Sequence, residues 1–257
     1  FVSITTQKGT AVELTRRKIT DLVDENYVYA YALYYLGIRF YEYPEDTLEQ
    51  VCRQRGLNVA QVIRRLESVA APKENTPLPL QDLPVDLVIE YLKHTHHLFI
   101  RHKLPYIARL IETLDGARTP LADDLRIVFP LFVEDFIHHI HDEEDTLFRY
   151  IALLHRARHR RVNPGRLYYQ MEKHSIQRYA MDHDTHDDEM RGIREITNGY
   201  CWEPTAGQRL RVIFLELQAF EQELQTHARI ENEILFPKAL LLESEIKRML
   251  GQSTKLN

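Results

Sequence analysis

The 257-residue sequence is poor in cysteine, glycine and proline, and each shortage narrows the class of protein. Two cysteines, Cys52 and Cys201, are too few for a disulfide framework or a cysteine-rich metal site, and they indicate a reducing, cytoplasmic compartment. Nine glycines and eleven prolines are too few for the dense turns of a β-rich chain or for a disordered chain. The composition therefore predicts a folded and mainly helical protein.

Two further absences bear on the partners of the chain. The formal net charge is −5, so the chain has no basic excess to hold nucleic acid or an anionic membrane. No apolar run approaches the ~20 residues of a membrane span, and the N-terminus lacks a basic-then-apolar signal pattern. We expect neither a nucleic-acid partner nor a membrane partner.

The distribution of histidine and proline divides the chain. All thirteen histidines follow residue 93, and four prolines lie between residues 72 and 84. A proline run of this kind breaks helices and forms a semi-rigid, extended linker. We therefore expect a small helical domain over residues 1–72, a proline-rich linker over 73–84 and a helical bundle over 85–257.

Helix signals support the small N-terminal domain. Apolar residues from Ile19 to Tyr27 recur at helical spacing. Thr47 and Asn58 each precede a further apolar pattern, and both residue types are favoured N-caps. We expect three short helices in this segment.

Four longer stretches carry apolar residues at alternating steps of three and four, which is the seam of a left-handed helical bundle. They cover residues 97–114, 125–143, 176–193 and 210–234. The seam of the first stretch reads His97, Ile100, Leu104, Ile107, Ile111 and Leu114. The connections between stretches are short, so the sequence predicts an all-α fold with an antiparallel four-helix bundle.

Six polar residues occupy seam positions where apolar residues are expected. They are His97, His139, Glu143, His186, His227 and Glu231. Burying an unpartnered carboxylate costs several kcal/mol, and a bound metal would compensate two of them together with the imidazoles. We predict that these six residues are metal ligands.

Two of the helices repeat one motif, H-x3-E-x3-L-F. It spans residues 139–148 and again 227–236. A spacing of four places the histidine and the glutamate on one helix face, one turn apart. Imidazole and carboxylate ligands without thiolate suit iron, manganese or zinc, and two facing glutamates can bridge two cations. For redox chemistry we expect iron, with zinc and manganese less favoured.

With these motifs, residues 85–240 resemble a hemerythrin-like (HHE cation-binding) domain. The two H-x3-E helices and the segment His186-Asp187-Asp188 carry this likeness. The first ~70 residues resemble the N-terminal domain of the repair-of-iron-centres (RIC) proteins, through Asp21–Tyr27, Leu36–Ile38 and Leu48–Glu67. The resemblance implies an Fe–O–Fe di-iron centre with Glu143 and Glu231 as bridging ligands.

The chain departs from that family in two places. The N-terminal domain usually carries a Cys-Cys pair after its Gly-Ile, where this chain has Phe40-Tyr41-Glu42-Tyr43. The family also often supplies a further histidine after the first bundle helix, and residues 106–124 contain none. His183 or His94 could take its place, or one iron keeps an open position. We expect His94, His96 and His102 otherwise to lie at the surface.

The resemblance implies a stress-response protein that restores iron–sulfur clusters damaged by oxidation or nitric oxide. Its partners would be O2 or NO and iron–sulfur proteins, and a homodimer is one option for its assembly. Three alternatives stay open at this point: a reversible O2 or NO carrier or sensor, an iron donor or store, and an enzyme that reduces NO or peroxide. No residue is assigned a catalytic role.

Overall fold

The computed structural model describes residues 11–71, 79–116, 120–159, 162–184 and 188–253. All regular secondary structure in these ranges is helical, and the extended contacts there reduce to one isolated bridge between Lys18 and Thr47. The expected all-α fold class is confirmed. No helix in these ranges combines the length and the apolar character needed to cross a lipid bilayer.

The chain divides into two compact units. The first unit comprises Phe1–Thr76 and Trp202–Leu215, and the second comprises Pro77–Cys201 and Glu216–Asn257. Of the expected linker, residues 73–78 lie outside the described residues. Leu80 belongs to the second unit and is buried. The boundaries 1–72, 73–84 and 85–257 stay a prediction.

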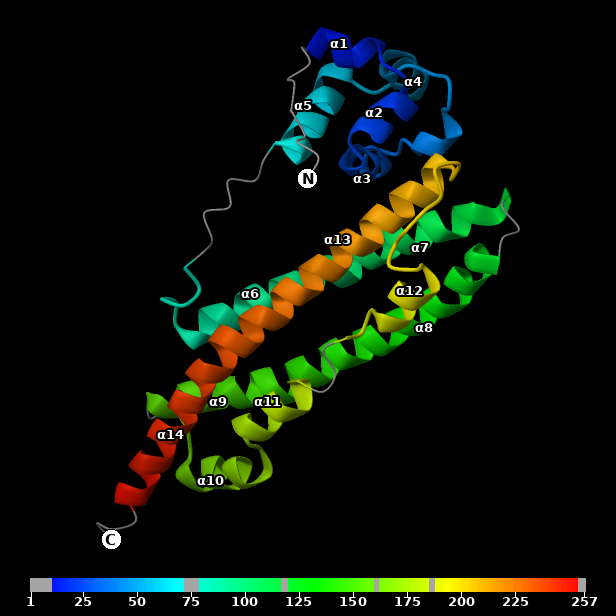
Figure 1. Ribbon diagram of the computed structural model, residues 1–257. Coiled ribbons are helices and arrows are strands. Elements are labelled where there is room, and N and C mark those ends of the chain that lie inside the picture. Colours follow the sequence, from blue (N-terminus) through cyan, green and yellow to red (C-terminus); the bar gives the residue numbers. More distant parts are fainter. Residues whose placement is uncertain (1–10, 72–78, 117–119, 160–161, 185–187, 254–257) are drawn as a thin grey trace. The chain divides into compact units, whose positions relative to one another are not determined.

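The described residues 11–71 of the first unit form five short α-helices and one 3-10 turn, drawn from blue to cyan in Figure 1. They are α1 (Ala11–Arg16), α2 (Ile19–Glu25), α3 (Val28–Tyr35), η1 (Phe40–Glu42), α4 (Leu48–Arg55) and α5 (Val59–Ala70). The two expected N-caps are confirmed, because Thr47 accepts a hydrogen bond from the amide of Gln50 and Asn58 accepts one from Gln61. Gly56 ends α4 at φ 65°, a left-handed conformation that glycine adopts without strain.

The second unit is built from longer helices. Its elements are α6 (Val85–Leu98), η2 (Phe99–Lys103), α7 (Leu104–Glu112), η3 (Thr113–Gly116), α8 (Pro120–Glu143), η4 (Glu144–Phe148), α9 (Arg149–Arg158), α10 (Pro164–Lys173), α11 (Ile176–Asp184), α12 (Arg191–Ile196), α13 (Gln208–Ile230), η5 (Glu231–Leu235) and α14 (Phe236–Ser253). The first eight residues of α13 belong to the first unit. The segments η2, η4 and η5 are π-helical turns, each of which continues one long helix into the next.

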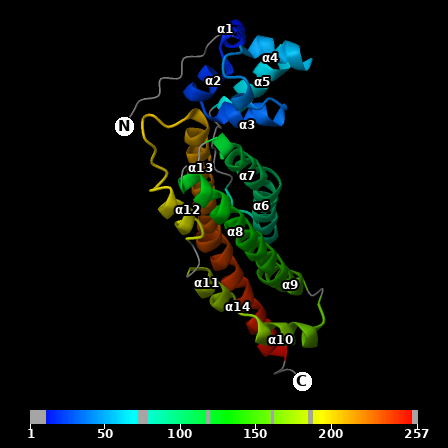
Figure 2. The same ribbon diagram turned by 90° about the vertical axis from the view of Figure 1, so that its right-hand side faces the viewer.

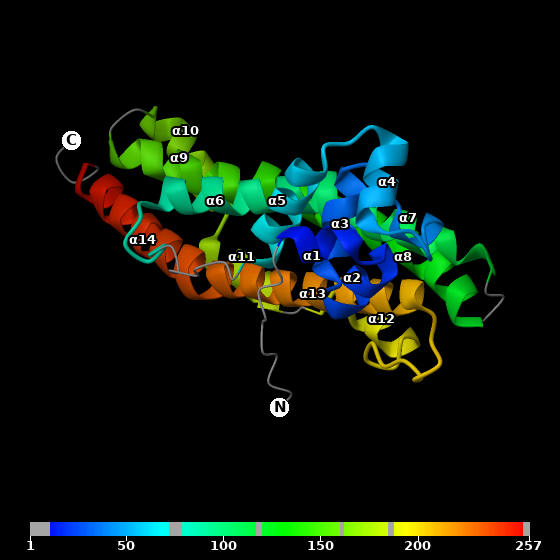
Figure 3. The ribbon, with the colours of Figure 1, turned by 90° about the horizontal axis from the view of Figure 1, so that it is seen from above.

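These helices pack as an antiparallel four-helix bundle. Helices α6 and α7, joined by η2, form the first column of the bundle, and α8 and α9, joined by η4, form the second column. Helix α7 packs on α8 and α6 packs on α9, so the two columns run antiparallel and side by side (Figure 2). Helix α14 packs on α9, while α11 and α12 contact α14 and α8 respectively. Seen from above, α6 lies beside α9 (Figure 3). The expected bundle is confirmed.

The third bundle helix differs from the expectation of one continuous helix over residues 176–193. The structure has α11 and α12 instead, with residues 188–190 outside both helices. Residues 182–189 read DHDTHDDE, and short polar side chains of this kind hydrogen-bond to nearby backbone and disfavour helix interiors.

The Leu-Phe ends of the two repeated motifs anchor the core of the second unit. Leu147, Phe148, Leu235 and Phe236 are all buried in one cluster with residues of α6, α9 and α14. In the first motif copy the glutamate directly precedes a π turn, and in the second copy it begins one. In both copies the Leu-Phe pair that follows packs the same helix into the core.

Candidate metal centre

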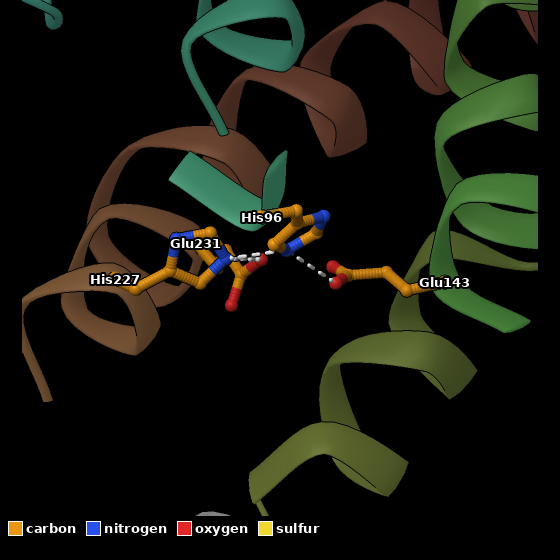
Figure 4. Close-up of side chains that lie close together, drawn as sticks. All are labelled: His96, Glu143, His227 and Glu231. Carbon is orange, nitrogen blue, oxygen red and sulfur yellow. Dashed lines mark hydrogen bonds and ion pairs between the residues drawn. The ribbon is translucent and has the colours of Figure 1, made fainter. Parts of the chain in front are cut away.

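Four buried polar side chains converge in the interior of the second unit, as Figure 4 shows. His96 comes from α6 and Glu143 is the last residue of α8. His227 lies near the end of α13, and Glu231 is the first residue of η5. One ligand atom from each of the four residues lies within 4.8 Å of the others.

The contacts within this cluster are short. The Nε2 atoms of His96 and His227 are 2.9 Å apart, and Glu231 Oε1 lies 3.0 Å from His227 Nε2. The His96 Nε2 atom is also 3.5 Å from Glu143 Oε2. On its other side, the His96 Nδ1 atom lies 2.9 Å from Glu144 Oε1.

Burial changes the proton affinity of two of these groups. Burial, followed by the neighbouring His227 imidazole, lowers the pKa of His96 to about 4, so its ring is neutral near pH 7. Burial and then the charge of Glu231 raise the pKa of Glu143 well above its ordinary value. In the absence of a cation, it is therefore unfavourable for Glu143 and Glu231 to be ionised at the same time.

The donor set fits a cation. Glu143 Oε1 is buried and has no hydrogen-bond partner among the described residues. Buried polar atoms are rarely left without a partner, and a bound ion is one explanation for such atoms. Two imidazoles and two carboxylates, with no thiolate, suit iron, manganese or zinc.

A cavity of about 70 Å³ adjoins the cluster. Its wall includes all four residues, and also His139, Glu189 and Leu224. A site for one water molecule needs roughly 10–15 Å³ on this measure, so there is room for a few small molecules.

The cluster contains His96 and not His97, the neighbour that the sequence predicts as a ligand. His97 is exposed, whereas His96, expected at the surface, is buried in the cluster. The π turn η2 explains the difference, because it separates the buried Phe99 from the buried Leu104 by five residues instead of four. Reading the seam backwards from Leu104 in steps of three and four therefore places every earlier position one residue too late.

The other expected ligands fall into four groups. Glu143, His227 and Glu231 lie in the cluster, while His139 lies at the cavity wall with its Nε2 atom 3.8 Å from Glu189 Oε1. His94 is exposed and takes no part in the cluster. His186 lies outside the described residues, and the side chain of His183 is likewise not described. The two motif copies are thus alike in their buried glutamates but differ in their histidines, because His139 keeps 38% of its side chain exposed.

The fold and the site together define a helical-bundle protein with a buried histidine–glutamate cluster whose side chains are of the kinds that bind cations. Residues 87–239 match the family described as Hemerythrin HHE cation binding domain, and the chain belongs to that family. The expected hemerythrin-like resemblance is confirmed.

Relatives of known name extend this result beyond the bundle. The chain is 23% identical over 197 residues to the probable iron-sulfur cluster repair protein of Haemophilus influenzae, covering 75% of this chain and 82% of the relative. It is 25% identical over 203 residues to the iron-sulfur cluster repair protein YtfE of Pectobacterium atrosepticum, covering 76% of this chain and 84% of the relative. The expected likeness to proteins of iron-centre repair is confirmed by these names.

Proposed function

We propose that the chain is a non-haem di-iron protein that takes part in iron–sulfur cluster repair under oxidative or nitrosative stress. The observation that carries the proposal is the pair of buried glutamates, Glu143 and Glu231, facing two imidazoles in the bundle interior. Two cations of charge +2 would neutralise the carboxylates and engage Glu143 Oε1, which has no hydrogen-bond partner among the described residues. The names of the similar relatives support the biological role.

In this proposal the chain supplies ligands from all four bundle helices. His96, Glu143, His227 and Glu231 form the inner set, with the two glutamates as bridging ligands. His139 would complete it, together with either His183 or His186. Bound iron would supply one-electron redox chemistry and open positions for small ligands, and the protein residues would hold it away from bulk water.

The N-terminal unit contributes no thiol pair. Phe40 is buried in η1 at the place of the family's Cys-Cys pair. Cys52 is buried in α4, and burial raises the pKa of its thiol, which keeps it protonated and unreactive at neutral pH. We therefore assign iron binding to the bundle. An iron–sulfur protein would interact with the surface of the full chain.

The first test is metal analysis of anaerobically purified full chain, combined with an optical spectrum. We expect about two irons per chain and the absorption of a bridged di-iron centre. One zinc per chain, which four ligands would close tetrahedrally, would overturn the proposal.

The second test concerns repair. An iron–sulfur protein damaged by nitric oxide should recover its cluster faster with the wild-type chain than with Glu231→Gln. Equal recovery with both proteins would contradict the repair role. The small cavity also favours a second candidate, a carrier or sensor of O2 or NO, for which a stable adduct without turnover would be the signature.

A further inference from the structure

One carboxylate touches the cluster from outside it. The Oε1 atom of Glu144 lies 2.9 Å from Nδ1 of His96, on the side of the ring that faces away from His227. Glu144 keeps 31% of its side chain exposed, whereas the His96 side chain is 3% exposed. A carboxylate only accepts hydrogen bonds, so the His96 Nδ1 atom carries the hydrogen and donates it.

This contact determines what the other nitrogen of His96 presents. A neutral imidazole has a single N–H, so its Nε2 atom turns a lone pair toward the cluster. The hydrogen in the 2.9 Å contact between the two Nε2 atoms therefore belongs to His227, which donates to His96. In the same tautomer the Nδ1 atom of His227 carries no hydrogen, and this atom has no hydrogen-bond partner in the described parts of the chain.

The face of the His96 ring is fixed by the same helical turn. Phe148 stacks on it with ring centroids 5.8 Å apart and an interplanar angle of 3°. Glu144 and Phe148 are the first and last residues of the π turn η4, directly after Glu143. One π turn of the second bundle column thus contacts both the edge and the face of an imidazole carried by the first.

We propose that Glu144 is a positioning residue of the metal centre, which holds His96 as its Nδ1–H tautomer so that Nε2 is the atom that binds the cation. The inference rests on the proposed metal function and deepens it. Loss of a hydrogen-bond partner behind a ligating histidine typically costs 10–100-fold in metal affinity.

The binding test uses the full chain and Fe(II) under anaerobic conditions, with a chelator of known affinity as competitor. We expect Glu144→Ala to weaken Fe(II) binding by roughly 10–100-fold. Glu144→Gln keeps an acceptor oxygen and should restore most of the affinity. Asp145→Ala is the matched control, because this substitution removes the same charge one residue away. Asp145 is 67% exposed and pairs with Arg149. It should bind Fe(II) as the wild type does.

The tautomer test uses the metal-free wild type and needs no variant. Nitrogen NMR of the histidine rings should give His96 with its hydrogen on Nδ1, and Glu144→Ala should show a mixture of both tautomers. A wild-type His96 with its hydrogen on Nε2, or equal Fe(II) affinity of Glu144→Ala and wild type, would overturn the role of Glu144. Failure of the wild type to bind Fe(II) at all would instead overturn the proposed metal function. If Glu144→Ala does not fold, the wild-type tautomer decides.

Discussion

The Nε2 atoms of His96 and His227 face each other at 2.9 Å in the interior of the bundle, although the two residues are 131 positions apart in the chain. Two imidazole nitrogens at this distance share one hydrogen, because two N–H groups would repel and two lone pairs would not bond. A cation bound between the rings would replace that hydrogen and bind both lone pairs. This contact therefore lies within the candidate metal site.

The first prediction separates His96 from its neighbour. His96→Ala should lose iron, because it removes a buried nitrogen from the cluster, whereas His97→Ala should keep the wild-type iron content because His97 is exposed. Iron per chain after anaerobic loading and desalting is the measurement. Loss of iron from His97→Ala alone would show that the regular seam register is the correct one.

That difference also shows how far the sequence alone could lead. The apolar residues Val85, Ile89 and Leu92 continue in steps of four and three to His96 and Phe99. Reading backwards from Leu104 gives the competing register with His97. The two registers disagree by one residue, which is the expected mark of a π turn between them. The fold class and three of the four cluster residues followed from periodicity and motif, because Glu143 and His227 precede a π turn and Glu231 begins one.

Other features of the site depend on contacts between distant helices, and periodicity does not report such contacts. Glu144 lies one residue after a seam position and would be expected on another helix face. It reaches His96 because η4 is a π turn and because α6 packs on α9. No pattern within residues 139–148 predicts which imidazole stands opposite.

The second prediction concerns the bridging glutamates. Glu143→Gln and Glu231→Gln should each lose iron, because an amide is a weaker ligand than a carboxylate and cannot neutralise a cation. In each variant the rise in melting temperature that iron gives the wild type should disappear, since only a bound ligand stabilises the folded state. The control is Glu134→Gln, an exposed residue of α8, which should keep both the iron and the rise. A full rise in either cluster variant would contradict the assignment.

The third prediction concerns a buried carboxyl away from the cluster. Burial raises the pKa of Glu216 to about 7 from 4.5, despite Lys103, whose Nζ atom lies 4.0 Å away. The folded chain therefore binds this proton more tightly than the unfolded chain, so its free energy of unfolding falls as pH rises from 4.5 to 7. Above pH 7 the ionised Glu216 carboxylate lowers the free energy of unfolding by roughly 3 kcal/mol.

Glu216→Gln removes that penalty. We expect it to raise the free energy of unfolding by roughly 2–3 kcal/mol at pH 8 and to change it little at pH 4, measured by urea denaturation of the metal-free chain. Glu223→Gln is the matched control, because Glu223 also pairs with Lys103 but is 42% exposed. An equal effect of Glu216→Gln at both pH values would contradict the raised pKa.

The fourth prediction concerns the N-terminal unit. A chain that begins at Pro84 should still bind iron, because His96, Glu143, His227 and Glu231 all follow this residue. It lacks the groups that hold the start of α13, where Gln208 donates to the carbonyl of Thr20 and Arg211 to the carboxylate of Asp24. Backbone amides over residues 208–215 should therefore exchange hydrogen faster than in the full chain. Loss of iron from the shortened chain would contradict the assignment of iron binding to the bundle alone.

Anomalous scattering at the iron absorption edge, from crystals of the full chain grown anaerobically with Fe(II), would show directly whether Glu143 and Glu231 bind iron. We predict two iron peaks at the cluster, both within bonding distance of Glu143 and Glu231, with His96 and not His97 at one of them. Absence of iron density between these glutamates, or a single ion that scatters at the zinc edge, would contradict it.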